Sequence, residues 1–179
     1  MLIKTIFSGF GGQGVLSMGN TLANAAMLQG KYVTYLPSYG AEVRGGTANC
    51  TVSIGDEEIA SPVASEPDFV VSMNQPSFLK FQSTLQTGGL ILVNASLVNV
   101  TAARGDIEVI EVPANGLAEK LGSVRAANMV LLGAFIRVSN LISLPLMLKN
   151  LPEILGEAKA KLIKINREAL EAGYNYIKE

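Results

Sequence analysis

The stretch FSGFGGQG, residues 7–14, stands between an apolar segment and a long helical pattern, and it decides the fold class. Residues 2–8 (LIKTIFS) are apolar or β-prone and predict a first strand. Residues 12–29 place apolar side chains at helical spacing, and Gly30 ends the pattern. Residues 31–37 (KYVTYLP) predict a second strand. This strand–helix–strand unit predicts a parallel pair of strands joined by a right-handed crossover.

The rest of the chain continues to alternate between strands and helices. The patterns predict strands at 47–54, 68–73, 89–96 and 107–114, and helices at 76–86, 114–122, 125–139 and 153–177. The sequence shows no internal repeat, linker or low-complexity stretch. Its 179 residues therefore predict one domain, 1–179, with a three-layer Rossmann-like α/β fold. In this fold a mostly parallel sheet is flanked by helices.

Composition narrows the classes of function. Hydrophobic residues make up 49% of the chain and charged residues 16%, against roughly 25% charged in a typical domain. So low a charge favours a surface partly covered by a partner over a free-standing, core-rich domain. The net charge of −1 and the lack of a Lys/Arg cluster argue against nucleic-acid binding. No apolar run approaches the roughly 18 residues of a membrane span, and the opening stretch is too short for a signal peptide, so we expect a cytoplasmic protein with no membrane contact.

Cysteine and histidine counts exclude several chemistries. The chain has one cysteine, Cys50, and no histidine. It cannot by itself hold an iron–sulfur cluster or a Cys/His zinc site, and it has no Ser-His-Asp triad. We therefore assign no catalytic residue and no metal ligand. Cys50 lies in the alternating pattern of residues 47–54 and is predicted to be a small core residue.

The glycines of the opening stretch allow three interpretations. Gly9, Gly11 and Gly14 fit the pattern G-x-G-x-x-G, but a dinucleotide site also needs an acidic residue near the end of the second strand, and none occurs before Glu42. A helix start still offers free N–H groups to a phosphate, a carboxylate or a partner's backbone, and Gln13 adds an amide. The third interpretation is that the glycines only let helix and strand pack closely.

A second motif, SYGAEVRGG at residues 38–46, follows the second predicted strand. It is expected at the same carboxyl edge of the sheet as the glycines. Tyr39, Glu42 and Arg44 are large polar residues among glycines, which favours a binding surface. The alternative is a solvated Glu42–Arg44 ion pair of little energetic value.

Asn74 follows the predicted strand 68–73, again at a carboxyl edge. It could face the same crevice as the glycines. It could equally cap the helix that follows, because asparagine is a favoured N-cap residue.

These motifs together resemble a known family. FSGFGGQG at the start of a helix, with SYGAEVRGG after the second strand, is similar to the gamma subunit of 2-oxoacid:ferredoxin (or acceptor) oxidoreductases. The beta subunit of indolepyruvate oxidoreductase is a related protein. The resemblance runs over most of the chain and includes PDFVVSMNQPSF. The form SYG-x-E-x-RGG resembles the 2-oxoglutarate and 2-oxoisovalerate branches more than the pyruvate branch.

The resemblance implies an activity that belongs to a complex. Such complexes convert a 2-oxoacid and coenzyme A into acyl-CoA and CO2, using thiamine diphosphate and iron–sulfur clusters. In the family these cofactors lie on other subunits, so none is expected in this chain. The implied partners are alpha and beta thiamine-binding subunits and a ferredoxin-like delta subunit. The chain would contribute subunit packing and help to shape the coenzyme A approach, and the isolated chain would be inactive. Self-association of the isolated chain is left open.

The resemblance also implies residues for ligand binding or subunit contact. Gly11, Gly12, Gln13 and Gly14 match the glycine motif of the family, and Tyr39, Glu42, Arg44, Gly45 and Gly46 match its second motif. Gly9 and Ser38, which lie within the two quoted stretches, join these candidates, as does Asn74 at the carboxyl end of the predicted strand 68–73. Two alternatives remain: a free-standing nucleotide-binding Rossmann-like protein, and a scaffold that touches no ligand.

Overall fold

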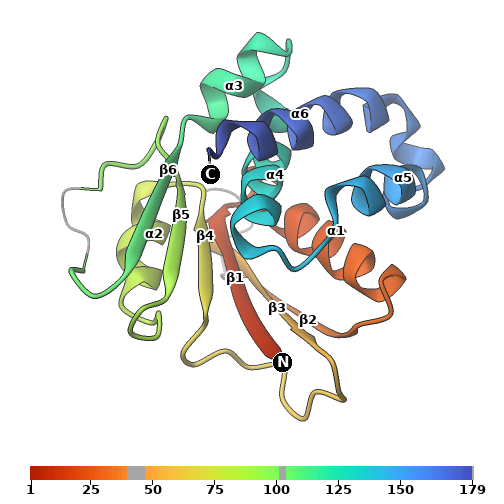
Figure 1. Cartoon of the computed structure of the whole chain (residues 1–179). Helices are drawn as coiled ribbons and strands as arrows, with labels where there is room; N and C mark the ends of the chain where they lie inside the picture. Colours follow the sequence, from red (N-terminus) through yellow and green to blue (C-terminus); the bar gives the residue numbers. More distant parts are fainter. Residues whose placement is uncertain (40–46, 101–103, 179) are drawn as a thin grey trace.

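The computed structural model describes residues 1–39, 47–100 and 104–178. Within them, one sheet holds six strands in the order β2-β3-β1-β4-β5-β6 (Figure 1). The strands are β1 (Leu2–Phe10), β2 (Tyr32–Tyr39), β3 (Thr47–Gly55), β4 (Phe69–Ser72), β5 (Leu90–Asn94) and β6 (Glu108–Val112). The helices are α1 (Val15–Leu28), α2 (Gln75–Gln82), α3 (Ala114–Lys120), α4 (Ala127–Ser139), α5 (Leu144–Leu155) and α6 (Ile163–Tyr176), with 3-10 turns η1 (Val124–Ala126) and η2 (Glu157–Leu162).

The sheet is mostly parallel, as the sequence predicts, but the expected pairing of its first two strands is wrong. β1, β4, β5 and β6 form parallel neighbours. β3 lies between β1 and β2 and runs antiparallel to both. β1 and β2 therefore point the same way without touching. The reason is that β3 returns directly after β2 and pairs with β1 over its full length, from Leu2 opposite Gly55 to Phe10 opposite Thr47.

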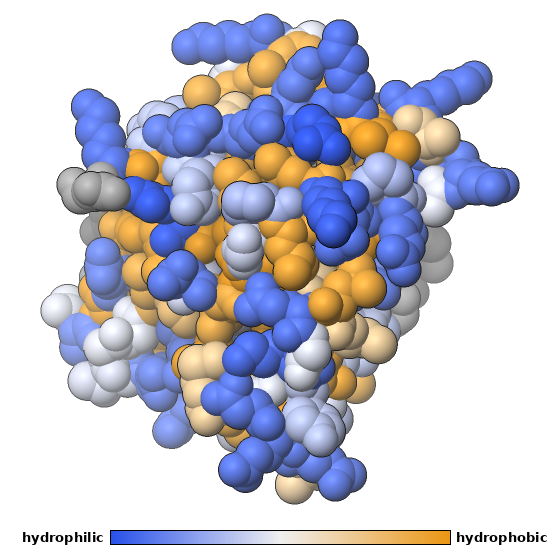
Figure 2. All heavy atoms as spheres, turned by 45° about the vertical axis from the view of Figure 1, so that its right-hand side comes forward, coloured by the Kyte–Doolittle hydropathy of each residue, from blue (hydrophilic) through white to orange (hydrophobic). Residues whose placement is uncertain are grey.

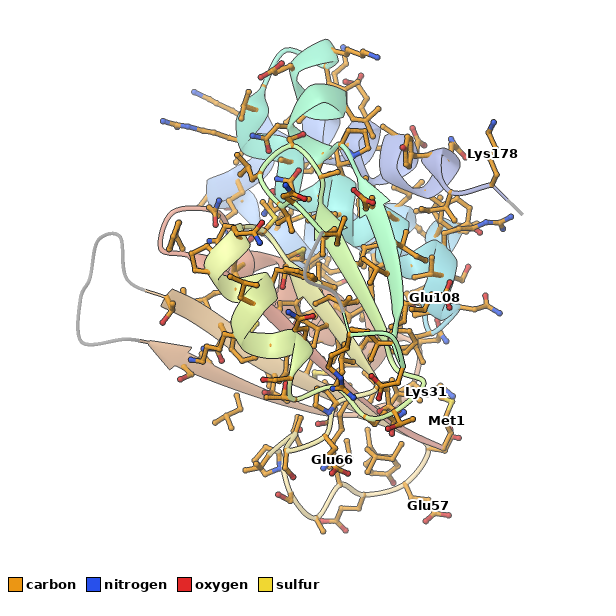
Figure 3. All side chains as sticks on the ribbon, turned by 90° about the vertical axis from the view of Figure 1, so that its left-hand side faces the viewer. Met1, Lys31, Glu57, Glu66, Glu108 and Lys178 are labelled. Carbon is orange, nitrogen blue, oxygen red and sulfur yellow. The ribbon has the colours of Figure 1, made fainter. Side chains whose placement is uncertain are left out.

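Helices cover both faces of the sheet and make three layers. α1, α4, α5 and α6 lie on one face, and α2 lies on the other, where it crosses the strands in Figure 3. Alternate residues of each strand point to opposite faces. In β1, Phe7 joins the larger core beneath α1 and α4, whereas Ile6 joins a smaller core with Phe78 and Phe81 of α2. The predicted three-layer α/β architecture is confirmed.

The C-terminal helical region differs from its prediction. The single helix expected at 153–177 is wrong, because α5 ends at Leu155 and Gly156 follows with a φ of 71°. That left-handed conformation suits glycine and turns the chain into η2 before α6 begins. α5 itself was not predicted. It begins with Pro145 in its first turn, a position where proline is tolerated, and it also contains Pro152.

α4 and α6 cross with their backbones in close approach. A Cβ built on Gly133 would meet the backbone of Leu170, and one built on Gly173 would meet the carbonyl oxygen of Val130. One glycine on each helix therefore allows the contact. On the sheet side of α4, Phe135 is fully buried and packs edge-to-face against two other phenylalanines.

A surface ion pair lies at the amino end of the sheet. Lys31, labelled in Figure 3, donates a hydrogen bond of 2.6 Å from Nζ to Asp56 Oδ1. This bond is the main reason that the pKa of Asp56 lies below its usual value. The pair lies before β2 and just after β3, so it occupies the opposite end of the sheet from the glycine motif.

Apolar side chains also reach the surface. Figure 2 shows them between hydrophilic residues on the side that carries α1, α5 and α6. Met27 and Leu28, at the end of α1, are 61% and 43% exposed. In the part of the chain that the structure describes, no helix combines the length and apolar character needed to span a bilayer.

Candidate functional site

The glycine turn, residues 11–14, joins β1 to α1. Gly12 and Gly14 have φ values of 95° and 75°, in the left-handed region that glycine adopts without strain. The sequence predicted a helix that begins at residue 12, but these conformations are not helical and prevent that start. α1 begins instead at Val15, with Gly14 as its N-cap and no side chain capping it.

The glycines of the motif have different roles. A Cβ on Gly9 would lie 2.7 Å from Val15 Cγ2 and 2.9 Å from Met73 Cβ, so Gly9 permits close packing. A Cβ on Gly14 would meet the side-chain amide of Asn128. Gly12 is different: it is exposed, and no atom lies within 4 Å of the place where its Cβ would be. Close packing therefore explains Gly9 and Gly14, whereas Gly12 is explained by the left-handed backbone of the turn.

Gln13 ties the turn to the neighbouring strand. Its Oε1 accepts hydrogen bonds from the backbone N–H of Phe10, at 2.7 Å, and from Asn74 Nδ2, at 2.8 Å. Asn74 Oδ1 in turn accepts from the N–H of Ser77 at 3.0 Å and caps α2. The cap interpretation of Asn74 is therefore confirmed, and its side chain also contacts the glycine turn through Gln13.

Replacement of Asn74 by Ala is expected to lower the free energy of unfolding by about 1–2 kcal/mol. The change removes the N-cap of α2 and one of the two bonds that hold Gln13. Asn74→Asp keeps an acceptor for Ser77 but replaces the donor to Gln13, so it should restore part of the lost stability. Urea unfolding of the three proteins measures this, and equal stability of wild type and Asn74→Ala would contradict it.

A pocket of about 170 Å³ opens beside the glycine turn at the carboxyl edge of the sheet. We call it the carboxyl-edge pocket. It is lined by Gly12, Gln13, Met73, Leu97, Asn115, Val124, Arg125, Ala127 and Asn128. The structure thus brings two predicted residues, Gly12 and Gln13, together with side chains from more than a hundred residues later. Asn74 reaches the same region through Gln13.

The polar side chains from the later segment were missed by the sequence analysis. Asn115, Arg125 and Asn128 lie on α3, η1 and α4. Asn128 could have been recognised in the sequence, because it is a polar residue within the buried, apolar part of α4. It is 7% exposed, and its Nδ2 donates a hydrogen bond of 3.2 Å to the carbonyl oxygen of Gly14. Asn115 and Arg125 carried no local signal.

The second motif is described only at its beginning. Ser38 is exposed near the end of β2, and Tyr39 is the last residue of that strand. Glu42, Arg44, Gly45 and Gly46 lie outside the described residues. β3 then begins at Thr47, opposite Phe10 at the end of β1. The end of β2 and the start of β3 therefore lie at the same edge of the sheet as the glycine turn.

Cys50 is a core residue, as predicted. It is fully buried in β3, and its Sγ lies 3.7 Å from the carbonyl oxygen of Val15. Burial raises the pKa of the thiol from 9.0 to about 12. In addition, the described part of the chain holds no group of three Cys, His, Asp or Glu residues able to bind a metal ion.

The buried thiol is expected to be unreactive in the folded protein at pH 8. Thiolate attacks disulfide reagents, and burial both blocks access and keeps the thiol protonated. Because the pKa is higher in the folded state, the thiol does not reduce stability below about pH 9 and destabilises the fold as pH rises from 9 toward 12. A DTNB assay with and without urea checks this, and rapid labelling of the native protein would contradict it.

The fold and the pocket define a Rossmann-like α/β domain with a crevice of mixed polar and apolar lining at the carboxyl ends of its strands, where such sheets bind ligands. Residues 4–176 match the family model described as pyruvate ferredoxin/flavodoxin oxidoreductase, and the chain belongs to this family. The resemblance found in the glycine turn and the second motif is thus confirmed.

Individual relatives agree with the family. The ketoisovalerate oxidoreductase subunit VorA of Methanothermobacter thermautotrophicus is 37% identical over 99% of this chain, and the chain spans 37% of its length. The chain also spans 37% of the length of the VorA subunit of Methanothermobacter marburgensis. The 2-oxoglutarate synthase subunit KorC of Methanocaldococcus jannaschii is 34% identical over 96% of this chain and 92% of its own.

Solved structures agree as well. The gamma subunit of a keto/oxoacid ferredoxin oxidoreductase from Geobacter sulfurreducens has a TM-score of 0.82, at 28% identity over 97% of this chain and 96% of its own. A 2-oxoglutarate:ferredoxin oxidoreductase from Magnetococcus marinus, with coenzyme A bound, has a TM-score of 0.88 over 99% of this chain and 32% of its own. At 21% identity this second likeness concerns the fold alone.

Proposed function

We propose that this chain is the gamma-type component of a 2-oxoacid:ferredoxin or acceptor oxidoreductase. The complex would convert a 2-oxoacid and coenzyme A into acyl-CoA and CO2 and pass the two electrons to ferredoxin or another acceptor. The observation that carries the proposal is the match, over nearly the whole of both chains, to the KorC subunit.

We assign the substrate to the 2-oxoglutarate or 2-oxoisovalerate branch. The VorA and KorC relatives are 34–37% identical to this chain. The pyruvate synthase subunit PorC of Methanothermobacter thermautotrophicus is 29% identical. The order of these identities supports the branch that the second motif indicates.

We assign the reactive cofactors to other subunits. An iron–sulfur cluster needs several cysteine thiolates, and this chain offers one cysteine, which is buried and protonated. The chain has no histidine for proton transfer. Thiamine diphosphate and the clusters would therefore lie on alpha and beta thiamine-binding subunits and a ferredoxin-like delta subunit. The complex would be cytoplasmic.

We propose that the chain contributes the carboxyl edge of its sheet to the contact with other subunits or with coenzyme A. Exposed glycines at 11 and 12 leave backbone open to a partner or to coenzyme A. Leu97 and Val124 flank the pocket and are 44% and 45% exposed, so a bound partner would remove apolar surface from water there. The residues of the second motif, from Ser38 to Gly46, would extend the same contact surface.

Purification of the tagged chain from the organism that encodes it tests the proposal. Thiamine-binding and ferredoxin-type chains should be captured with it, and the captured assembly should oxidise 2-oxoglutarate or 2-oxoisovalerate in the presence of coenzyme A. The isolated chain should show neither this activity nor iron or flavin absorbance. Oxidation of a 2-oxoacid by the isolated chain would contradict the proposal. Tight calorimetric binding of NAD would favour the free-standing nucleotide-binding alternative.

A further inference from the structure

A second pocket, of about 630 Å³, opens at the end of the sheet that lies away from the glycine turn. Residues 65–66, 83–87 and Arg104 line it, and we call it the amino-end pocket. These segments shortly precede β4, β5 and β6, so they lie at the amino ends of three parallel strands. Figure 3 shows Glu66 at the same end of the molecule as Lys31.

The hydroxyl groups after α2 present acceptors to this pocket, because their hydrogens are used inside the protein. Ser83 Oγ donates to the carbonyl oxygen of Lys80 at 2.8 Å. Thr84 Oγ1 donates to the carbonyl oxygen of Phe81, also at 2.8 Å. A carbonyl oxygen only accepts, so both hydroxyl groups keep oxygen lone pairs and no hydrogen for a ligand.

Gln86 and Thr87 have the same polarity. Gln86 Nε2 donates to Asp68 Oδ1 at 2.9 Å, and because a carboxylate only accepts, this bond fixes the orientation of the amide. Gln86 Oε1 has no partner among the described residues. Thr87 Oγ1 donates to Asp106 Oδ2 at 3.2 Å, so its hydrogen is also used within the protein.

The carboxyl end of α2 adds a partial negative charge. α2 ends at Gln82, directly before residues 83–87 of the lining. The last carbonyl groups of a helix favour cations. Arg104 already uses this end, since its Nη1 donates to the carbonyl oxygens of Gln82, at 2.8 Å, and Leu85, at 2.9 Å. The chain therefore places one nitrogen cation of its own at this helix end.

Glu66 gives the pocket an excess of negative charge. Its side chain is exposed and forms no ion pair with any residue that the structure describes. The charge of Arg104 is balanced by Asp106, which accepts from both Nε and Nη2. Lys4 lies outside the lining, where its Nζ donates to the carbonyl oxygen of Val63. The carboxylate of Glu66 therefore remains available to a ligand.

We propose that the amino-end pocket binds the ammonium group of an organic amine through Glu66 and the oxygen acceptors of Ser83, Thr84 and Gln86. An ammonium group carries only donors, which matches this lining. A calcium ion fits less well, because it takes about six to eight oxygen ligands, several of them carboxylates. The lining supplies one carboxylate. The volume leaves room for the carbon chain of the amine, and the inference does not depend on the proposed function.

NMR titration of the full chain tests the site with three probes: putrescine, 1,4-butanediol and N-acetyl-lysinamide. The backbone signals of Glu66, Gln86 and Thr87 should shift with putrescine. The diol has the same carbon chain without the charges and should bind at least about tenfold more weakly, because hydrogen bonds to charged groups are stronger. Shifts with N-acetyl-lysinamide as well would assign the site to a lysine side chain of a partner, and shifts with putrescine alone would assign it to a free polyamine.

Two variants and one control decide the assignment. Glu66→Gln removes the charge of the exposed carboxylate and should weaken putrescine binding about fivefold. Ser65→Asp adds a carboxylate at an exposed position of the lining and should strengthen binding by about the same factor. Glu119→Gln removes an equal charge from α3, outside the lining, and should change the affinity by less than about twofold, since distant exposed charges are screened.

Every result bears on the amine site separately from the proposed function. Absence of shifts with putrescine, equal affinity for putrescine and the diol, or unchanged affinity in both variants would overturn the site. Equal weakening by Glu66→Gln and Glu119→Gln would also overturn it, because the attraction would then follow net charge alone. Capture of thiamine-binding and ferredoxin-type chains needs none of these outcomes, so the proposed function stands or falls on that capture.

Discussion

Replacement of Gly173 by Ala is expected to lower the free energy of unfolding by about 3 kcal/mol. The added Cβ would meet the carbonyl oxygen of Val130 and lie 3.0 Å from the backbone N of Ala134. Backbone atoms cannot move aside by rotating a side chain, so α6 and α4 would have to separate. That separation would open the core around Leu170, which is fully buried beneath the crossing.

Urea unfolding measures this effect, and a second glycine supplies the control. Gly116 lies in α3 with no atom within 4 Å of its Cβ position and no positive φ. Gly116→Ala should therefore leave stability unchanged or raise it by up to about 1 kcal/mol. Equal stability of Gly173→Ala and Gly116→Ala would contradict the close crossing of the two helices.

Replacement of Phe135 by Ala is expected to cost about 3–5 kcal/mol. The ring of Phe135 is fully buried and joins α4 to the sheet. It packs edge-to-face on Phe7 of β1, with 5.6 Å between centroids, and on Phe69 of β4, with 5.5 Å. Its removal would leave a cavity between these strands and the helix, at the centre of the larger core.

Thermal and urea unfolding should both report the loss. Leu79→Ala is the matched control, because Leu79 is 47% exposed on α2 and its truncation should change stability by about 0.5 kcal/mol or less. Phe135→Leu keeps most of the volume and should fall between the control and Phe135→Ala. A cost for Phe135→Ala no larger than that for Leu79→Ala would show that the cluster does not stabilise the fold.

Local patterns predicted the strands and helices better than they predicted which strands pair with each other. The alternation in Thr47–Gly55 and the apolar run before Asn74 identified β3 and β4, because each side chain's environment follows from its own segment. The insertion of β3 between β1 and β2 had no local signal. Strand order depends on which backbone edges meet in three dimensions, and a strand–helix–strand pattern is compatible with an inserted neighbour.

The residues around the carboxyl-edge pocket were likewise predicted only where a local pattern marks them. The glycines, Gln13 and Asn74 could be found because turn and cap chemistry is encoded within a few residues. Arg125 could not, since it reaches the pocket only through the packing of α4 against the sheet. The break at Gly156 was missed because its positive φ is a property of the folded backbone, while the residues on both sides keep a helical pattern.

The position of β3 also has a consequence for changes in chain length. Tyr39 pairs with Ala48 across the sheet, and Phe10 pairs with Thr47. The end of β2 and the start of β3 thus adjoin the end of β1. Because the pairs within the strands set the register, we expect insertions or deletions between Tyr39 and Thr47 to leave the pairing of β2, β3 and β1 unchanged.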